Sequence, residues 1–154
     1  MAKEDLKLVI ALSRAHRSLI GSIEKWLRPF DLSVSEFGVL EFLFHKGSKS
    51  VQEIAKRILV TSGTITYVID KLVSKTLVQR TRCPEDNRRY TVELTSEGET
   101  LIRRIFPLHE EFLNQMFSDF SVQEQNQLNE SLFRLDTMIV HRDTKEHYHD
   151  TSIV

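Results

Sequence analysis

Apolar residues recur at steps of three and four along most of the chain, which places them on one face of an α-helix. The first stripe predicts a long helix over about residues 4–27, which Pro29 ends. Shorter stripes predict helices over about residues 35–45 and 51–58, and a last stripe predicts a helix over about residues 122–140.

Three of these helix starts share the pattern Ser-x-x-Glu, which is typical of a capping box. The serine oxygen can accept a hydrogen bond from a first-turn backbone N–H, and the glutamate can reach back to the N–H of the serine. The pairs are Ser33 with Glu36, Ser50 with Glu53, and Ser121 with Glu124. Each pair precedes an apolar helical pattern, so the sequence predicts where these helices begin.

A short turn after the third predicted helix leads to a fourth helix. We expect Thr61 or Ser62 to cap its start, and the helix to reach about Ser74. Its buried face is predicted from a stripe of branched apolar residues: Ile65, Val68, Ile69, Leu72 and Val73. The order helix, short turn, helix is that of a helix-turn-helix.

After this helix the apolar period changes from 3.6 to 2, which indicates strands. We predict two antiparallel strands over residues 77–82 and 89–94. Residues 83–88 between them form the predicted hairpin tip, where Pro84 and Asp86-Asn87 supply turn chemistry. The predicted fold is therefore mainly α with a small β-hairpin wing, a winged helix-turn-helix.

A further long helix is expected to follow the hairpin. Thr95 would cap it, and it would run to about Phe117. Pro107 lies inside this helix, so we expect a kink there.

Charge separates the middle of the chain from its ends. The whole chain has a formal net charge of −1. Residues 46–92 hold ten basic and four acidic residues, a local charge of +6, which leaves −7 for the remainder. A basic centre between acidic flanks is expected when one part of a protein faces phosphate, although a solvated charged face would give the same pattern.

The face of the fourth helix opposite its apolar stripe carries short polar residues. In a helix-turn-helix the second helix enters the major groove with its N-terminal residues at the base edges. We therefore predict duplex DNA as a partner, through Ser62, Gly63, Thr64, Thr66, Tyr67 and Lys71. Thr64, Thr66 and Tyr67 are the candidate base readers, and Lys71 is a candidate phosphate contact. Because no arginine lies on this face, we expect an A·T-leaning site read partly by shape.

The predicted hairpin tip carries two arginines beside an acid. An arginine at a wing tip can enter a narrow minor groove, where the negative potential is enhanced. We therefore predict that Arg88 and Arg89 contact DNA, and that Asp86 holds Arg88 or another base in position. Turn chemistry with solvated arginines would explain the same residues, so both interpretations stay open.

Residues 32–98 resemble the MarR family of bacterial winged-helix regulators. Residues 86–98 are similar to the family's pattern of Asp-x-Arg, a strand and Leu-Thr-x-x-Gly, and residues 61–72 are similar to its recognition helix. The resemblance implies a transcriptional regulator in which Arg88 contacts DNA and Asp86 orients it. One departure is Thr76, which stands where the family usually has glycine and puts a left-handed helix cap in doubt.

The resemblance also implies a homodimer that represses from a pseudo-palindromic operator. Residues 1–31 and 105–154 would supply the dimerisation helices, and residues 32–104 would be the DNA-binding domain. The apolar stripes of the flanking helices are long for covering one small domain, although an intramolecular core would also explain them.

Members of the family commonly release DNA when a small aromatic or phenolic ligand binds between the dimerisation helices and the DNA-binding domain. Such a ligand must bind the DNA-free arrangement of the protein more tightly than the DNA-bound arrangement. The candidate effector contacts are His16, Phe42, His45 and Phe106. His16 lies on an apolar stripe, where a histidine is more often hydrogen-bonded within a core or an interface. The recognition helix and the Cys83-Pro84 wing resemble the branch of the family that responds to quinones or hydroquinones.

Cys83 is the single cysteine, which excludes an intramolecular disulfide framework and fits a reducing cytoplasm. Oxidation or alkylation of its thiol would disturb the wing, so a redox or electrophile sensor is an alternative. An inert cysteine at a strand end is the other interpretation, because a reactive thiol needs a lowered pKa.

Other classes of protein fit the sequence less well. It has no glycine-rich phosphate loop, no His-Glu-x-x-His and no Gly-x-Ser-x-Gly, so we expect neither an enzyme nor a cofactor. No apolar run approaches the roughly 20 residues of a membrane span, so a cytoplasmic protein without a membrane partner is expected. A winged helix that binds protein is an alternative, but the positive charge of residues 46–92 argues against it.

The tail, residues 141–154, is predicted to fray. Four of its residues could ligate zinc: His141, His147, His149 and Asp150. A flexible tail rarely makes a closed site, so we expect no metal there.

Overall fold

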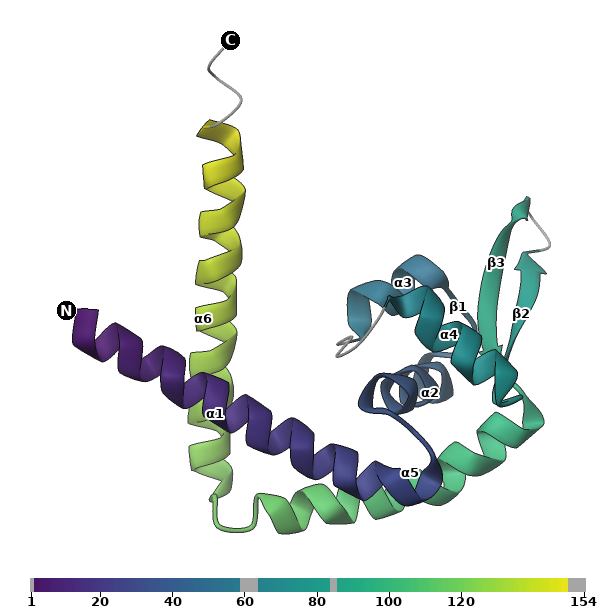
Figure 1. The fold of residues 1–154 in the computed structure, drawn as a ribbon, viewed down its shortest axis with the longest axis horizontal. Helices are drawn as coiled ribbons and strands as arrows, with labels where there is room; N and C mark the ends of the chain where they lie inside the picture. The colour runs from purple at the N-terminus through teal and green to yellow at the C-terminus, as the bar shows by residue number, and fades with distance from the viewer. Residues whose placement is uncertain (1, 59–63, 84–85, 150–154) are drawn as a thin grey trace. The chain divides into compact units, whose positions relative to one another are not determined.

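The computed structural model describes residues 2–58, 64–83 and 86–149, without the side chains of residues 2, 87, 88 and 143–149. The chain divides into two compact units, Met1–Pro107 and Leu108–Val154. The helices are α1 (Ala2–Leu27), α2 (Val34–Lys46), α3 (Val51–Arg57), α4 (Ile65–Ser74), α5 (Ser96–Met116) and α6 (Val122–His149), with a 3-10 turn η1 (Arg28–Phe30) after α1. This order confirms the mainly α fold with a β-hairpin wing (Figure 1).

The three predicted capping boxes are confirmed. The side-chain oxygens of Ser33 and Ser50 accept from the backbone N–H groups of Glu36 and Glu53, and both glutamates accept from the serine N–H groups. Backbone and side-chain hydrogen bonds from Ser50 lower the pKa of Glu53. The same exchange joins Ser121 and Glu124 at the start of α6.

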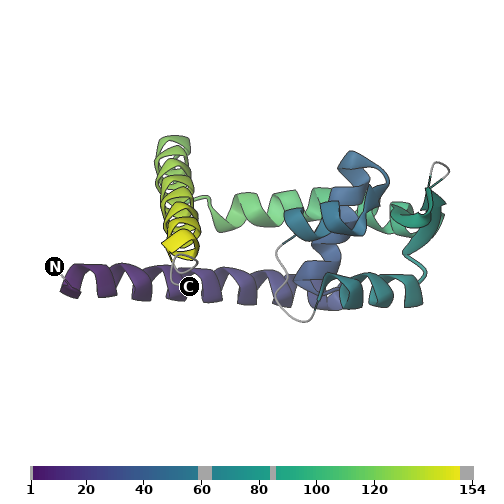
Figure 2. The ribbon, with the colours of Figure 1, turned by 90° about the horizontal axis from the view of Figure 1, so that it is seen from above.

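The core of the first unit lies where α1, α2, α4 and the first part of α5 meet. Leu27 at the end of α1 is fully buried, as are Leu40 of α2, Leu72 of α4 and Ile102 of α5. Burying one such side chain stabilises the fold by about 1.5–3 kcal/mol. α1 runs as one unbroken helix before it joins this core (Figure 2).

Helix α4 begins later than predicted. Thr64 is its cap: the backbone of Thr64 is extended (φ −90°, ψ 161°), and its hydroxyl oxygen accepts from the N–H of Tyr67 at 3.4 Å. The prediction that Thr61 or Ser62 caps the helix is therefore wrong, and both lie outside the described residues. Any of these hydroxyl residues can cap a helix, so composition alone does not choose between them.

The sheet has three antiparallel strands in the order β1-β3-β2. β2 (Val78–Cys83) and β3 (Asp86–Leu94) form the predicted wing, and the two-residue β1 (Lys49–Ser50), which is not predicted, pairs with β3. The prediction of a hairpin tip over residues 83–88 is wrong in its extent. An irregularity after Arg82 lets the ladder continue, and Cys83 is paired with Asp86.

Thr76 adopts the left-handed conformation that the sequence puts in doubt. Its φ is 59°, and the N–H groups of Thr76 and Leu77 donate to the carbonyls of Val73 and Leu72. This pair of hydrogen bonds closes the C-terminal end of α4 in the Schellman arrangement. The hydroxyl of Thr95 donates to the carbonyl of Thr76 at 2.6 Å, so tertiary contacts hold a conformation that the residue type disfavours.

Thr76→Gly is expected to raise the free energy of unfolding by about 0.5–1 kcal/mol. The left-handed conformation costs an L-residue about 1–2 kcal/mol, and part of that gain is lost because glycine is more flexible in the unfolded chain. The measurement is the urea unfolding midpoint, with Thr76→Ala as the control that removes the hydroxyl but keeps the Cβ. A midpoint for the glycine variant at or below that of the wild type would contradict the strain.

The second unit contains the end of α5 and the whole of α6. α6 continues to His149, so the prediction that residues 141–154 fray is wrong for residues 141–149, and residues 150–154 lie outside the described part of the chain. No glycine or proline follows Val140 to end the helix. Pro107 lies inside α5, at the boundary between the units, and the kink there stays a prediction. In the described part of the chain, no helix is long and apolar enough to cross a membrane.

Candidate nucleic-acid interface

The exposed face of α4 and its cap gathers four of the six residues predicted to bind DNA from this helix. Thr64, Thr66, Tyr67 and Lys71 are all exposed. The Lys71 ammonium lies 5.5 Å from the centre of the Tyr67 ring, and residue Tyr67 is 53% exposed. Ser62 and Gly63 lie outside the described residues. The described part of this face offers a phenol ring, two threonine hydroxyls and a cation, which suits base edges and phosphate.

The tip of the wing pairs its acid with a base. A carboxylate oxygen of Asp86 lies 3.5 Å from Nε of Arg89, whose side chain is 82% exposed. The side chain of Arg88 lies outside the described residues, so its orientation by Asp86 stays a prediction.

Two further cations lie on the wing and are not predicted from the sequence. Arg80 and Arg82 alternate with Gln79 and Thr81 along β2, so they share a face of the hairpin. Nε of Arg82 donates to the hydroxyl of Tyr90 at 3.2 Å. The alternation would place the arginines together, but only the strand register shows that Arg82 is opposite Tyr90.

On the other face of the wing, hydrogen bonds within the hairpin hold a carboxylate. The hydroxyl of Thr81 and the side-chain amide of Gln79 donate to the carboxylate of Glu93. These hydrogen bonds lower the pKa of Glu93. The carboxylate of Glu93 is therefore neutralised within its own face of the hairpin, while the opposite face presents the exposed guanidinium of Arg82.

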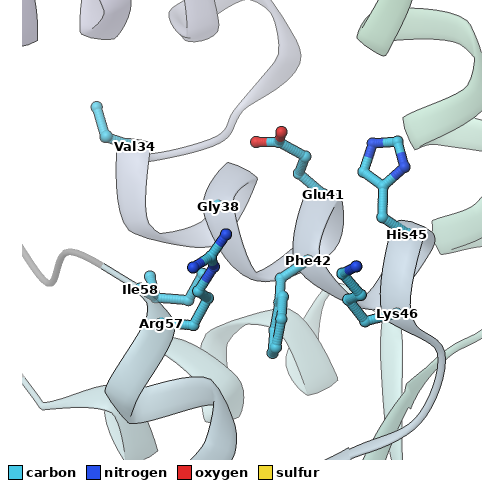
Figure 3. Close-up of a pocket in the computed structure, with 8 residues that line it drawn as sticks. All are labelled: Val34, Gly38, Glu41, Phe42, His45, Lys46, Arg57 and Ile58. Atoms are coloured by element: carbon cyan, nitrogen blue, oxygen red, sulfur yellow. The ribbon is translucent and has the colours of Figure 1, made fainter. Parts of the chain in front are cut away.

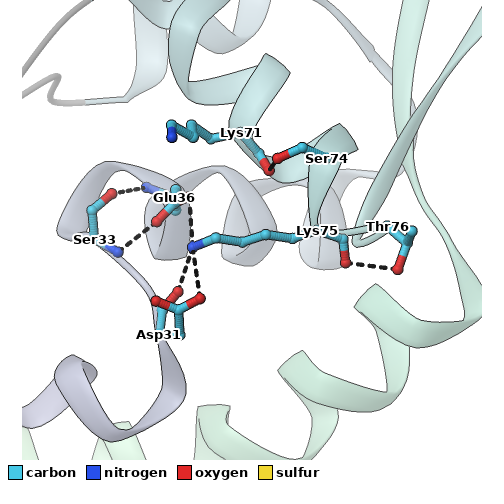
Figure 4. Close-up of polar contacts among 7 residues, drawn as sticks. All are labelled: Asp31, Ser33, Glu36, Lys71, Ser74, Lys75 and Thr76. Atoms are coloured by element: carbon cyan, nitrogen blue, oxygen red, sulfur yellow. Dashed lines mark hydrogen bonds and ion pairs between the residues drawn. The ribbon is translucent and has the colours of Figure 1, made fainter.

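Lys75 anchors the C-terminal end of α4 to the rest of the unit (Figure 4). Its ammonium lies 3.0 Å from a carboxylate oxygen of Glu36 and 3.5 Å from one of Asp31, and it donates to the carbonyl of Asp31. Glu36 is buried at the start of α2, where its other oxygen accepts from the N–H of Ser33. Because the acid is nearly inaccessible to water, its lysine partner contributes to holding α4 in place.

A cavity of about 580 Å³ lies between α2 and the end of α3 (Figure 3). It is lined by Val34, Gly38, Glu41, Phe42, His45, Lys46, Arg57 and Ile58. Two of the predicted effector contacts, Phe42 and His45, are among these residues. A third, Phe106 of α5, packs edge-on against the ring of His45 at a centroid distance of 4.8 Å. His16 is exposed on α1 and is not among the described residues that line the cavity.

Comparison with known proteins places this arrangement in a family. The model of the MarR family matches residues 32–90. The HTH-type transcriptional regulator MhqR of Bacillus subtilis is 41% identical over 135 residues, which cover 88% of this chain and 93% of MhqR. The chain belongs to the MarR family. It is a DNA-binding transcriptional regulator and not an enzyme, as the sequence predicts.

Other proteins are similar to this chain at lower identity. The HTH-type transcriptional regulator PecS of Dickeya dadantii is 27% identical and covers 89% of this chain and 84% of PecS. The Staphylococcus aureus MepR–DNA complex has a TM-score of 0.75 at 20% identity, covering 84% of this chain and 96% of that one. The structure of Bordetella bronchiseptica BpsR, whose DNA binding is regulated by 6-hydroxynicotinic acid, has a TM-score of 0.74 at 22% identity. The match covers 84% of this chain and 98% of the BpsR chain. These two structures confirm the winged-helix fold.

The remaining predicted sites of this MarR-family chain stay predictions. Cys83 is half-buried at the end of β2, and its redox role is untested. His141 is exposed on α6, while Asp150 and the side chains of His147 and His149 lie outside the described part of the chain. Over the described side chains, no group of three or more His, Cys, Asp or Glu residues is arranged to hold a metal ion.

Proposed function

We propose that this MarR-family regulator is a homodimeric repressor that binds a pseudo-palindromic operator through α4 and the wing. The observation that carries the proposal is the exposed face of α4, where Thr66, Tyr67 and Lys71 lie together. Side chains of these types read base edges and neutralise phosphate. The cations of the wing extend the same surface toward a flanking minor groove.

Exposed apolar residues support the dimer. On α1, Leu6, Leu8 and Val9 are each more than half exposed. On α6 the predicted stripe is also open to solvent, at Leu128, Leu132 and Ile139. Such stripes on long helices mark association surfaces when they are contiguous. Two subunits would present two recognition helices about one DNA turn, roughly 34 Å, apart.

Selection of bound duplexes from a random library tests the proposed DNA recognition. We expect an enriched palindromic motif, and affinity that falls steeply as salt rises because phosphate contacts release counterions. Sedimentation at micromolar concentration is expected to show a dimer. Monomers only, or a pool without a shared motif, would contradict the proposal, and salt-insensitive binding would favour the protein-binding alternative.

The cavity between α2 and α3 is the proposed effector site. Its volume lies within the range of about 300–1,000 Å³ for small-ligand sites. Phe42 and Ile58 offer an apolar wall, while Lys46 and Arg57 offer positive charge to a phenolate or carboxylate oxygen. BpsR, whose ligand has an aromatic ring, a hydroxyl and a carboxylate, supports an aromatic, phenolic or quinone-like effector here.

Phe42→Ala is expected to raise about tenfold the concentration of an active phenol or quinone that is needed to release bound DNA. The reason is that the aromatic ring of the effector loses the apolar wall that Phe42 provides. The measurement is the effector concentration that halves the fluorescence anisotropy of labelled operator DNA, for a panel of phenols and quinones. Cys83→Ser is the matched control and should leave release unchanged. Release that survives Phe42→Ala but is lost in Cys83→Ser would overturn the cavity and favour the thiol sensor.

A further inference from the structure

An ion pair joins the recognition helix to the wing. Nη2 of Arg80 on β2 donates to Oδ1 of Asp70 on α4 at 2.5 Å. The side chains of Asp70 and Arg80 are 56% and 34% exposed, so water reaches the pair. The two residues are ten positions apart in the chain.

Asp70 places a negative charge on the part of α4 that we propose to face DNA. It lies between Tyr67 and Lys71, which we propose to face DNA. A carboxylate near phosphate opposes binding, so simple electrostatics predicts that its removal strengthens the complex. An acid in this place is explained if it does something for the surface that outweighs the repulsion.

The position of the pair on the wing suggests what it does. The base of the hairpin is fixed because Val78 and Val92 are buried in the core. Arg80 comes two residues after Val78 on the same face of β2, and beyond it the side chains of Arg82 and Tyr90 are exposed. Arg80 is directly opposite Val92 in the ladder, so the ion pair holds the hairpin at the level of the last core residue on this face, next to the exposed part of the wing.

We propose that Asp70 and Arg80 are positioning residues that set the wing against the recognition helix. The pair would hold the hairpin at the spacing at which α4 enters the major groove while the wing tip reaches the adjacent minor groove. Without it, the wing must be ordered during binding, and that ordering reduces the affinity. The inference rests on the DNA-binding surface proposed above.

A double-mutant cycle on DNA affinity tests the positioning role. The variants are Asp70→Asn, Arg80→Gln, both together, and the exchange Asp70→Arg with Arg80→Asp. The probe is the duplex enriched by the wild-type chain, with a scrambled duplex as reference. Asp70→Asn is expected to weaken binding about three- to fivefold, the upper range for an exposed pair, although it removes negative charge. The double variant should be no worse than either single variant, and the exchange should restore part of the affinity.

The slope of affinity against salt separates positioning from contact. A positioning pair leaves the slope unchanged, whereas losing a phosphate contact makes it shallower by about one per subunit. Binding by Asp70→Asn that equals or exceeds wild type would overturn the proposal, as would a shallower slope for Arg80→Gln. Glu99→Gln, which breaks the exposed Glu99–Arg103 pair on α5, is the matched control and should not change affinity.

The two proposals fail in different ways. A wild-type chain that binds the enriched and scrambled duplexes equally well would contradict the DNA-binding surface and the positioning pair together. Wild-type discrimination with no loss in Asp70→Asn would contradict the positioning pair alone. Unfolding midpoints close to wild type are expected for all variants, because the pair is exposed, and they show that lost affinity is not lost folding.

Discussion

Gly98→Ala is expected to lower the free energy of unfolding by about 3 kcal/mol or more, at the upper end of the cost of overpacking. Gly98 lies in the first turn of α5, where its backbone touches the chain that leaves α4. A Cβ at this position would overlap the carbonyl oxygen of Leu77 and lie 2.9 Å from its carbonyl carbon. The obstacle is backbone, which cannot rotate away as a side chain can.

Neither partner is free to move. The carbonyl of Leu77 accepts from the N–H of Thr95 at 3.1 Å, and the N–H of Leu77 donates to Leu72 at 3.0 Å. The N–H of Gly98 donates to the hydroxyl oxygen of Thr95 at 3.0 Å. A shift that makes room for the methyl group would therefore break the cap of α5 or the C-terminal cap of α4.

Thermal and urea unfolding followed by circular dichroism measure this effect. Gly21→Ala on α1 is the matched control, because a Cβ there meets nothing within 4 Å. That substitution should be neutral or stabilise by up to about 1 kcal/mol, since alanine favours a helix interior. Equal midpoints for the two variants would contradict the close approach of α5 to Leu77.

Tyr67→Ala is expected to weaken binding to the enriched duplex about 10- to 100-fold and to relax its sequence preference, as the loss of a base-reading side chain does. The ring is exposed on α4, so its removal costs little folding free energy. Fluorescence anisotropy with the enriched and scrambled duplexes measures both affinities. Equal losses on the two duplexes would show that Tyr67 does not read sequence.

Lys71→Ala is expected to behave differently from Tyr67→Ala. It should weaken binding to all sequences alike and make the salt slope shallower by about one per subunit, because a lysine contacts phosphate and not bases. Lys25→Ala on α1, which also removes one exposed helical lysine, is the control and should leave both quantities unchanged.

Local features of this fold could be predicted from the sequence. Each capping box joins two residues three positions apart, so Ser33 and Glu36 carry the information for their own helix start. The alternation after α4 likewise predicts the wing. The start of α4 is missed because three hydroxyl residues compete within four positions, and conformation selects Thr64.

Features that depend on distant contacts could not be predicted. β1 has two residues and exists only by pairing with β3, more than 40 positions away. Thr76 is left-handed because Thr95 and the ladder of the wing hold it there, against its own preference. At the site, the residue types of α4 suffice to predict its exposed face. The Asp70–Arg80 and Lys75–Asp31 pairs need the folded chain, because their members are 10 and 44 positions apart.

Hydroxyl-radical footprinting of the wild-type chain on its enriched duplex tests the central proposal most directly. Two recognition helices and two wings should protect a two-fold symmetric pattern, with major-groove centres about one helical turn apart and flanking minor-groove protection. Arg88→Ala should remove the flanking protection and keep the centres. A single unsymmetric patch, or protection unaffected by both Tyr67→Ala and Arg88→Ala, would contradict binding through α4 and the wing.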